Sequence, residues 1–370
     1  MKVAVLGGYG NFGARICRAL AHDPSIELQV AGRDEGKARM LAREIGADAA
    51  QIDASSGHLA NTLQDAGIEL VIHTAGPFQA QHYGVALAAA KSGAHYIDLA
   101  DGRRFVCDFA SQVDDAFVAA DRCAVSGAST VPALSSAVVD AALAKLGRLD
   151  SIDICIAPAQ KAPRGRATLE GVLSYCGEPI QVWSGGRWQT QYGWEDPAPV
   201  TFARLKTRSG SLCDIPDLEI FPGRYPGVKD VMFRAALEVG FTQYVFAALS
   251  SLRRRGWIGS PRAMAGVLHR FGGAFDGLGT PDGGMVVRLA GEDLAGAPLR
   301  LAWHVTAGAF HGPEIPCMAA VLLARKLARG EGPASGARTA AGLLDLDEFA
   351  PEFARWGMTT EWEEEAAHGA

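Results

Sequence analysis

The sequence contains no apolar run long enough to cross a membrane, and no charged-then-apolar leader precedes its first predicted strand. We therefore expect a cytoplasmic protein without a membrane span. The seven cysteines form no CxxC pair and no Cys/His pair at ligand spacing. We interpret them as ordinary reduced thiols and expect no metal site.

The sequence also lacks a strongly positive or negative balance, since the net charge is only −6. It contains no basic stripe interleaved with aromatic residues. Nucleic acid is therefore not an expected partner. One arginine cluster, 253–255, follows an apolar helical stretch and is interpreted as a solvated helix end. The GxSxG elbow is absent too, which disfavours a serine hydrolase.

The length of 370 residues exceeds what one hydrophobic core usually organises, so two domains are expected. In the first third, strands alternate with helices as in an α/β doubly wound parallel sheet. From residue 152 on, strands interrupted by Gly-Gly and Pro turns indicate a second α+β domain with a mostly antiparallel sheet. In it, 285–289 and 299–305 are expected to pair as a hairpin through a turn at 291–298.

The most informative stretch is GGYGNFG, which follows a short apolar strand and precedes a helix. In this context Gly8 allows a tight turn, Gly10 lets the backbone approach a pyrophosphate, and Gly13 permits close packing of helix on strand. The positive end of the helix dipole would face the diphosphate. The residues predicted to bind a dinucleotide here are Gly7, Gly8, Tyr9, Gly10, Asn11, Phe12 and Gly13.

The residues after the second predicted strand bear on the choice of dinucleotide. Arg33 suits the ribose 2′-phosphate of NADP, whereas Asp34 suits the unphosphorylated ribose of NAD. NADP is favoured and NAD stays the alternative. Asp53, after the third strand, is placed beside the adenine, with a helix N-cap as an equally good interpretation.

A Gly-Pro turn ends the fourth predicted strand at the edge of the sheet where ligands bind. Ala75, Gly76, Pro77 and Phe78 are therefore added to the predicted cofactor site, with Phe78 forming a wall beside the nicotinamide.

Four motifs together resemble the saccharopine dehydrogenase-like family of NAD(P)-binding oxidoreductases, in its uncharacterised bacterial branch. They are GGYGNFG, AGPF, SGAHYIDLADG and SGASTVPALSS, and the resemblance extends to GTPDGGM and HGPEIP further along. It implies a Rossmann domain at 1–130, an α+β substrate and dimerisation domain at 131–312, and helices of 313–370 that return to the first domain. The Glu-rich tail after Trp362 is expected to fray.

Hydride transfer also requires a group that donates or accepts a proton near the operating pH. His95, Tyr96 and Asp98 lie in a predicted strand that ends at the ligand edge, so all three are catalytic candidates, with strand packing and a helix cap as the alternative. His73, inside the fourth strand, is more typical of a buried core histidine.

His311 is the favoured catalytic candidate because its loop lies between the predicted second sheet and the returning helix, and such loops often carry function. An ordinary loop histidine is the alternative. Lys161, Arg164 and Arg166 are candidates for a substrate carboxylate, or they form a solvated basic loop.

The sequence therefore predicts an NAD(P)-dependent oxidoreductase that acts on a small or medium substrate, as a homodimer. Imine/amine chemistry is favoured over carbonyl or enoyl reduction. A dinucleotide-binding protein without turnover is the alternative function.

Overall fold

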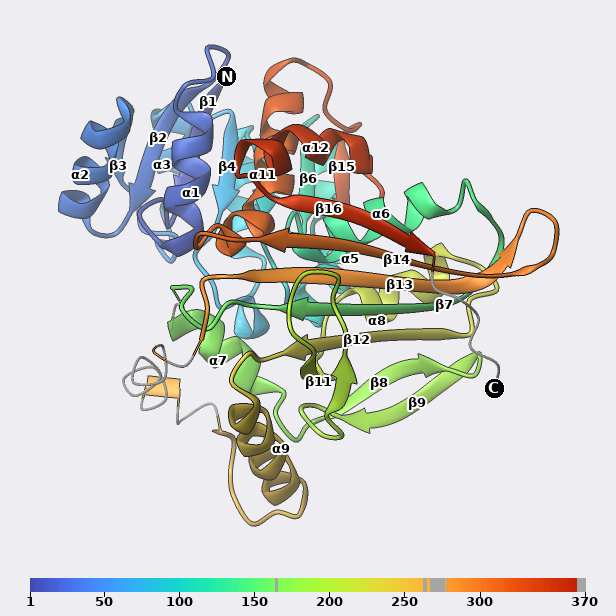
Figure 1. Ribbon diagram of the computed structural model, residues 1–370. Helices are drawn as coiled ribbons and strands as arrows, with labels where there is room; N and C mark the ends of the chain where they lie inside the picture. Colours follow the sequence, from blue (N-terminus) through green and yellow to red (C-terminus); the bar gives the residue numbers. More distant parts are fainter. Residues whose placement is uncertain (164–165, 262–264, 267–276, 278, 365–370) are drawn as a thin grey trace. The chain divides into compact units, whose positions relative to one another are not determined.

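The chain forms two compact units in the computed structural model (Figure 1), which describes residues 1–163, 166–261, 265–266, 277 and 279–364. The first unit comprises Met1–Leu134 and Glu314–Leu344, and the second comprises Ser135–Pro313 and Asp345–Ala370. The expected third segment, 313–370, thus divides between the two units.

In the first unit the described residues form a parallel sheet of seven strands. Near-continuous apolar runs build its centre, as expected for strands covered on both faces. The strands, in spatial order, are β15 (Gly336–Thr339), β6 (Cys123–Ser126), β5 (His95–Asp98), β4 (Leu70–His73), β1 (Lys2–Leu6), β2 (Glu27–Gly32) and β3 (Asp48–Gln51). Strands β1 to β3 are added toward one edge of the sheet and β4 to β6 toward the other, so the switch point where such sheets bind ligands lies between β1 and β4.

Helices connect these strands, as the alternating pattern predicts. They are α1 (Asn11–Leu20), α2 (Glu35–Ile45), α3 (Leu59–Asp65), the short η1 (Phe78–Ala80), α4 (Gly84–Ser92), α5 (Arg103–Ala119), η2 (Thr130–Leu134) and α11 (Ile315–Ala328). Helix α11 packs against α1, where an ion pair joins Arg15 to the buried Glu314 and Arg325 donates to the carbonyl of Ala19 at 3.0 Å. Most residues of α11 are buried.

The second unit contains a mixed sheet in which only β12 and β7 pair in parallel among the described strands. The path is β10 (Ala198–Val200), β11 (Arg208–Leu212), β12 (Asp230–Ala236), β7 (Leu146–Ala157), β13 (Gly283–Asp293), β14 (Pro298–Ala307) and β16 (Thr359–Glu364), with β8 (Pro179–Ser184) and β9 (Arg187–Tyr192) as a side hairpin. Its helices and short turn are α6 (Ser135–Ala142), α7 (Arg166–Ser174), α8 (Asp217–Arg224), α9 (Gly240–Arg254), η5 (Gly312–Glu314) and α12 (Leu346–Arg355). The two sheets confirm the predicted fold class.

Two local expectations of the second unit need correction. Gly291 is not a turn residue: it lies within β13 at a register shift, where a Cβ atom would come within 1.8 Å of the carbonyl oxygen of Arg148. The hairpin strands are therefore longer than expected. Residues 363 and 364 do not fray, because β16 pairs with β14 as far as Glu364.

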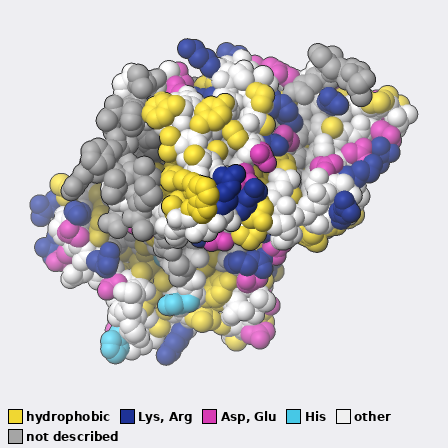
Figure 2. Space-filling view, turned by 90° about the horizontal axis from the view of Figure 1, so that it is seen from below, with side chains coloured by type: hydrophobic (Ala, Val, Ile, Leu, Met, Phe, Trp, Pro, Cys, Tyr) yellow, Lys and Arg dark blue, Asp and Glu magenta, His cyan; other side chains and the backbone are white. Residues whose placement is uncertain are grey.

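The arginine cluster at the end of α9 is only partly solvated. Arg253 donates to the carbonyl of Cys176 at 2.8 Å and pairs with Glu178, and Arg254 pairs with Glu195 at 2.8 Å. Hydrophobic side chains of α9 are also exposed, and the face seen in Figure 2 shows hydrophobic and basic side chains next to one another. No helix among the described residues is long and apolar enough to span a membrane.

Asp217 is a buried carboxyl at the start of α8. The hydroxyl of Ser135 donates to its Oδ2 at 2.5 Å, while Oδ1 has no hydrogen-bond partner among the described residues. Burial raises the pKa of Asp217 to about 7, against the effect of the Ser135 hydrogen bond. The folded protein is therefore more stable with the Asp217 carboxyl protonated than with it ionised.

We expect the stability of the fold to decline as the pH rises from about 4 to about 7, because the pKa of Asp217 is higher in the folded than in the unfolded chain. The pKa of Asp98, raised to about 6, acts in the same direction. Asp217→Asn should therefore raise the melting temperature at pH 8 and change it little at pH 5, with a gain of up to about 4 kcal/mol. Equal shifts at both pH values would contradict this role of Asp217.

Candidate functional site

The glycine-rich turn between β1 and α1 adopts the geometry of a phosphate-binding turn. Gly7 has a φ of +80°, which favours glycine, and the N–H groups of Gly7 and Gly8 both donate to the carbonyl of Ala31 at 3.0 Å. A Cβ atom on Gly13 would lie 2.2 Å from the carbonyl oxygen of Gly7, so only glycine lets α1 pack this closely.

Gly10 differs from Gly13 in what surrounds it. A Cβ atom on Gly10 would meet, among the described residues, only the carbonyl oxygen of Gly7, at 3.0 Å. Gly10 is also the N-cap of α1, no side chain caps this helix end, and its first turn contains no acidic residue. The first N–H groups of a helix lack intrahelical acceptors and favour an anion. The turn thus fits the diphosphate of a dinucleotide.

Tyr9 connects this turn to the end of β2. Its hydroxyl accepts a hydrogen bond from the N–H of Asp34 at 3.0 Å, and a Cβ atom on Gly32 would lie 2.4 Å from the Tyr9 ring. Gly32 is therefore required for the close approach of an aromatic ring, a contact that the sequence does not reveal.

The two residues predicted to decide between NADP and NAD have different surroundings. Asp34 is the N-cap of α2, where it accepts from the N–H of Lys37 at 3.0 Å, and this hydrogen bond is the main cause that lowers its pKa. Arg33 is exposed, and its charge helps to lower the pKa of Asp53. Asp53 itself accepts from the N–H and hydroxyl of Ser55, at 2.9 and 2.7 Å, in a local turn.

The Ala75–Phe78 turn follows β4, next to the glycine-rich turn. Thr74 connects the two, because its hydroxyl donates to the carbonyl of Leu6 at 2.9 Å. The Gly76–Pro77 peptide bond is cis. The amide of Gln81 donates to the carbonyls of Ala75 and Pro77, at 2.7 and 3.1 Å. Phe78 is only 5% exposed.

The three catalytic candidates of β5 are engaged with neighbouring strands. Tyr96 and Asp98 have no exposed surface. His95 Nδ1 accepts from the N–H of Cys123 at 3.0 Å, and burial lowers the pKa of His95. Direct contact of these residues with a substrate stays a prediction, and their burial favours a supporting role.

Asp98 is fixed at the end of β5 by β6 and the turn after it. Its Oδ1 accepts from the hydroxyl of Ser126 at 3.0 Å and from the N–H groups of Gly127 and Ala100, at 2.8 and 2.9 Å. Burial raises the pKa of Asp98 to about 6, although these hydrogen bonds act against the rise. The carboxyl therefore secures the ends of two strands at the ligand edge.

In the second unit, several predicted and unpredicted polar residues meet at one edge of the sheet. At this edge β7, β12 and β14 end, and β11 and β13 begin. The loops and strand ends there contribute Lys161, Arg208, Glu238, Asp282 and His311. Of the other two basic candidates, Arg164 lies outside the described residues, and the side chain of Arg166 is not described.

His311 lies in a strained loop after β14. The two residues before it, Ala309 and Phe310, have φ values of +50° and +66°, which non-glycine residues rarely adopt. His311 Nδ1 donates to the carbonyl of Trp356 at 2.9 Å, because only the carbonyl accepts. This tautomer leaves the lone pair of Nε2 available, which is what a general base requires.

Glu238 joins two loops at this edge. Its carboxylate accepts from the N–H of Gln160 at 2.9 Å and from the N–H of Thr280 at 2.8 Å. The loops also bond directly, since the N–H of Lys161 donates to the carbonyl of Thr280 at 3.3 Å. Lys161 is thereby held at the edge of the sheet, with its side chain exposed.

Arg208 is a buried residue that binds the same loops. Its side chain is 4% exposed and donates to the carbonyls of Pro158 and Asp282, at 2.9 and 3.1 Å, with Glu238 3.8 Å away. Burial lowers the pKa of Arg208. Arg208 and Glu238 could not be found from the sequence, because neither lies in a motif and the backbone groups that they bind are more than 40 residues away.

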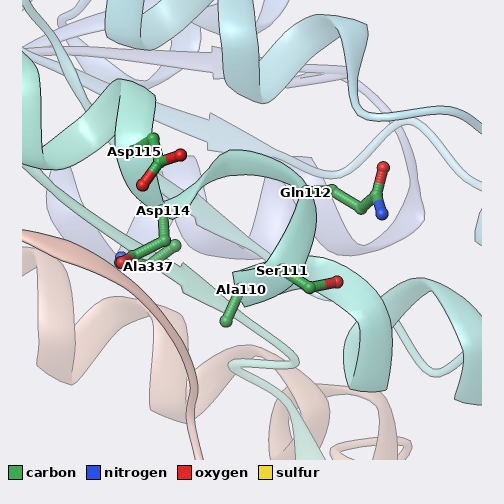
Figure 3. A pocket seen from close by; sticks show the side chains of 6 residues that line it. All are labelled: Ala110, Ser111, Gln112, Asp114, Asp115 and Ala337. Carbon is green, nitrogen blue, oxygen red and sulfur yellow. The ribbon is translucent and has the colours of Figure 1, made fainter.

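A pocket of about 430 Å³ lies between α5 and β15 (Figure 3). Of its residues, Asp114 accepts from the N–H of Ala337 at 2.6 Å. Because β6, β5 and β4 separate β15 from β1, this pocket is not the glycine-rich site. No group of His, Cys, Asp and Glu residues suited to a metal ion occurs in the part of the chain that the structure describes.

A parallel sheet with this strand order and a glycine-rich turn at its switch point defines a dinucleotide-binding domain. Residues 3–131 match the family described as the saccharopine dehydrogenase NADP binding domain. This match of the first part of the chain supports a nicotinamide dinucleotide cofactor and an oxidoreductase-type enzyme.

Two solved structures are similar to this chain over nearly its whole length. Apo saccharopine dehydrogenase (L-Glu forming) from Saccharomyces cerevisiae is similar with a TM-score of 0.72 and 13% identity, over 99% of this chain and 100% of that chain. Homospermidine synthase from Legionella pneumophila, in complex with NAD, has a TM-score of 0.64 and 8% identity, over 100% and 93%. At these identities the likeness shows a shared fold. No curated protein sequence matches the chain.

Proposed function

We propose that the protein is an NADP(H)-dependent oxidoreductase acting on a carbon next to nitrogen in a small or medium substrate. The observation that carries the proposal is the turn at Gly10, where an uncapped helix end and open space for a phosphate occur together in a domain of the NADP-binding family. A bound dinucleotide supplies the hydride acceptor or donor, and the chain supplies binding, orientation and a proton.

Different segments of the first unit would hold different parts of the dinucleotide. Gly7–Gly13 would hold the diphosphate, and Arg33 would hold the ribose 2′-phosphate. Ala75–Phe78 lies on the other side of the switch point, where the second half of a doubly wound sheet receives the nicotinamide half. NADP is favoured over NAD because Asp34 already caps α2, whereas Arg33 projects as an exposed cation.

Arg33→Ala is expected to weaken NADPH binding about tenfold or more and to change NADH binding little, because a charge-assisted contact contributes roughly 1.5–3 kcal/mol. Parallel titrations of both cofactors measure this. Arg39→Ala is a matched control, since it removes an exposed arginine of α2 that pairs with Glu35. Equal losses for both cofactors would mean that Arg33 only stacks on adenine, and a wild type that prefers NADH would shift the role to Asp34.

His311 is the proposed proton donor or acceptor. Its Nδ1 is fixed by the Trp356 carbonyl, so that Nε2 has a defined direction and a lone pair. The Gln160 and Thr280 loops, joined by Glu238, place Lys161 at the same sheet edge, where it would attract a substrate carboxylate.

Amine and imine substrates are favoured over carbonyl and enoyl ones. The shared fold of an L-Glu-forming saccharopine dehydrogenase supports this choice. The test mixes NADPH with 2-oxo acids and amines, with simple ketones, or with enoyl compounds, and follows NADPH consumption. Consumption that requires both oxo acid and amine is the expected result. NADPH binding without consumption in any mixture would favour the alternative, a dinucleotide-binding protein without turnover.

A further inference from the structure

A buried hydrogen bond links the two central strands on the nicotinamide side of the switch point. His73, the last residue of β4, and Tyr96 of β5 are respectively 2% and 0% exposed. Their contact joins His73 Nδ1 to the Tyr96 hydroxyl at 3.0 Å. Burial lowers the pKa of His73 to about 4, so the ring is neutral at physiological pH.

The His73 ring supports the Ala75–Phe78 turn. Phe78 packs edge-on against it, with ring centroids 5.1 Å apart, and the ring also hydrogen-bonds the backbone of Ala75. This hydrogen bond acts to raise the pKa of His73, against the larger effect of burial. The ring is therefore held between the Tyr96 hydroxyl on one side and the Ala75–Phe78 turn on the other.

The Tyr96 side chain is itself held in place. Its ring stacks on Phe109 with centroids 5.7 Å apart, and its hydroxyl lies next to Asp98, which raises the pKa of Tyr96 in addition to the larger effect of burial. Asp98 is fixed by Ser126 and Gly127. A continuous column of buried polar groups therefore runs from β6 through β5 and β4 to the turn.

We propose that Tyr96 is a positioning residue for the nicotinamide end of the cofactor: its hydroxyl fixes the His73 ring, and the ring fixes the Ala75–Phe78 turn. This inference rests on the proposed function, because it takes that turn to border the nicotinamide. Tyr96 and Asp98 would then position the turn from within the core. Their burial permits this role and disfavours direct contact with the substrate.

The test is Tyr96→Phe, which removes one oxygen atom and keeps the ring. Two ligands are titrated, NADPH and 2′-phospho-ADP-ribose, which retains the adenosine and diphosphate parts but has no nicotinamide. We expect about threefold to tenfold weaker NADPH binding, the value of one hydrogen bond, and unchanged binding of 2′-phospho-ADP-ribose. A merely structural role of Tyr96 would affect both ligands alike.

Tyr83→Phe is the matched control, because Tyr83 stacks on Phe105 in the same aromatic cluster and its hydroxyl donates to the Phe105 carbonyl at 3.3 Å. It should change neither affinity. Equal losses for both ligands in Tyr96→Phe, or no loss at all, would overturn the inference while leaving the proposed function intact. A wild type that binds neither ligand would contradict the proposed function and the inference with it.

A second measurement needs only the wild type. Nitrogen-15 NMR at pH 7 should show His73 as one neutral tautomer, because burial lowers its pKa and its Nδ1 is hydrogen-bonded to Tyr96. A charged ring, or two tautomers in exchange, would show that the His73 ring is not fixed and would overturn the inference.

Discussion

A Gly10→Val variant is expected to fold and to lose about a hundredfold or more in NADPH affinity, roughly 2.8 kcal/mol or more. The backbone of Gly10, with φ −75° and ψ 176°, is one that valine adopts readily. The added Cβ atom lies 3.0 Å from the Gly7 carbonyl oxygen, a tight contact that a small shift relieves. The branched side chain then extends into the space where the diphosphate would lie. Fluorescence titration with NADPH measures the loss.

Gly240→Val is the control for the bulk of the new side chain. Gly240 begins α9 in the second unit, and no heavy atom among the described residues lies within 4 Å of its Cβ position. This variant should bind NADPH like the wild type. A folded Gly10→Val protein with normal NADPH affinity would show that the glycine-rich turn does not bind the diphosphate.

His311→Ala is expected to lower kcat about 10²- to 10⁴-fold, the usual contribution of a general acid or base, and to leave NADPH affinity unchanged. The readout is the rate of NADPH consumption with the substrate found in the panel above, together with an NADPH titration. Separate effects on the two quantities are expected because His311 belongs to the second unit and the glycine-rich turn to the first.

His22→Ala serves as its control, since His22 is an exposed histidine of the first unit. It should leave kcat unchanged. If His311→Ala retains full turnover, the proton must come from a group other than His311.

The first unit could largely be predicted from the sequence, because its signals are local. The GGYGNFG turn, the apolar strands around it and the Gly-Pro turn after β4 each depend on neighbours in the chain, and all lie where the pattern predicts. Helix α1 begins at Asn11, within the motif itself, because Gly10 remains extended as the N-cap.

The site in the second unit was less predictable, because its contacts join distant parts of the chain. His311 and Lys161 could be named from their loops, but Glu238 carries no signal until Gln160 and Thr280 fold against it. Gly291 shows the same limit: its sequence suggests a turn, and only the approach of Arg148 reveals why a glycine is needed within a strand.

The surroundings of three catalytic candidates in the first unit could not be predicted from the sequence. His95, Tyr96 and Asp98 end a strand at the ligand edge, which is the position of catalytic residues in such sheets. Their side-chain directions depend on β4 and β6, and the structure turns them toward those strands instead of toward the surface. Sequence position therefore places these residues at the ligand edge but does not predict the direction of their side chains.

The most direct test of the central claim, that the chain binds a nicotinamide dinucleotide at the glycine-rich turn, is one titration of the wild-type protein with NADPH and NADH, followed by the fluorescence of the reduced nicotinamide. We expect saturable binding of one molecule per chain, with tighter binding of NADPH than of NADH. Failure of both cofactors to bind saturably would contradict the central claim.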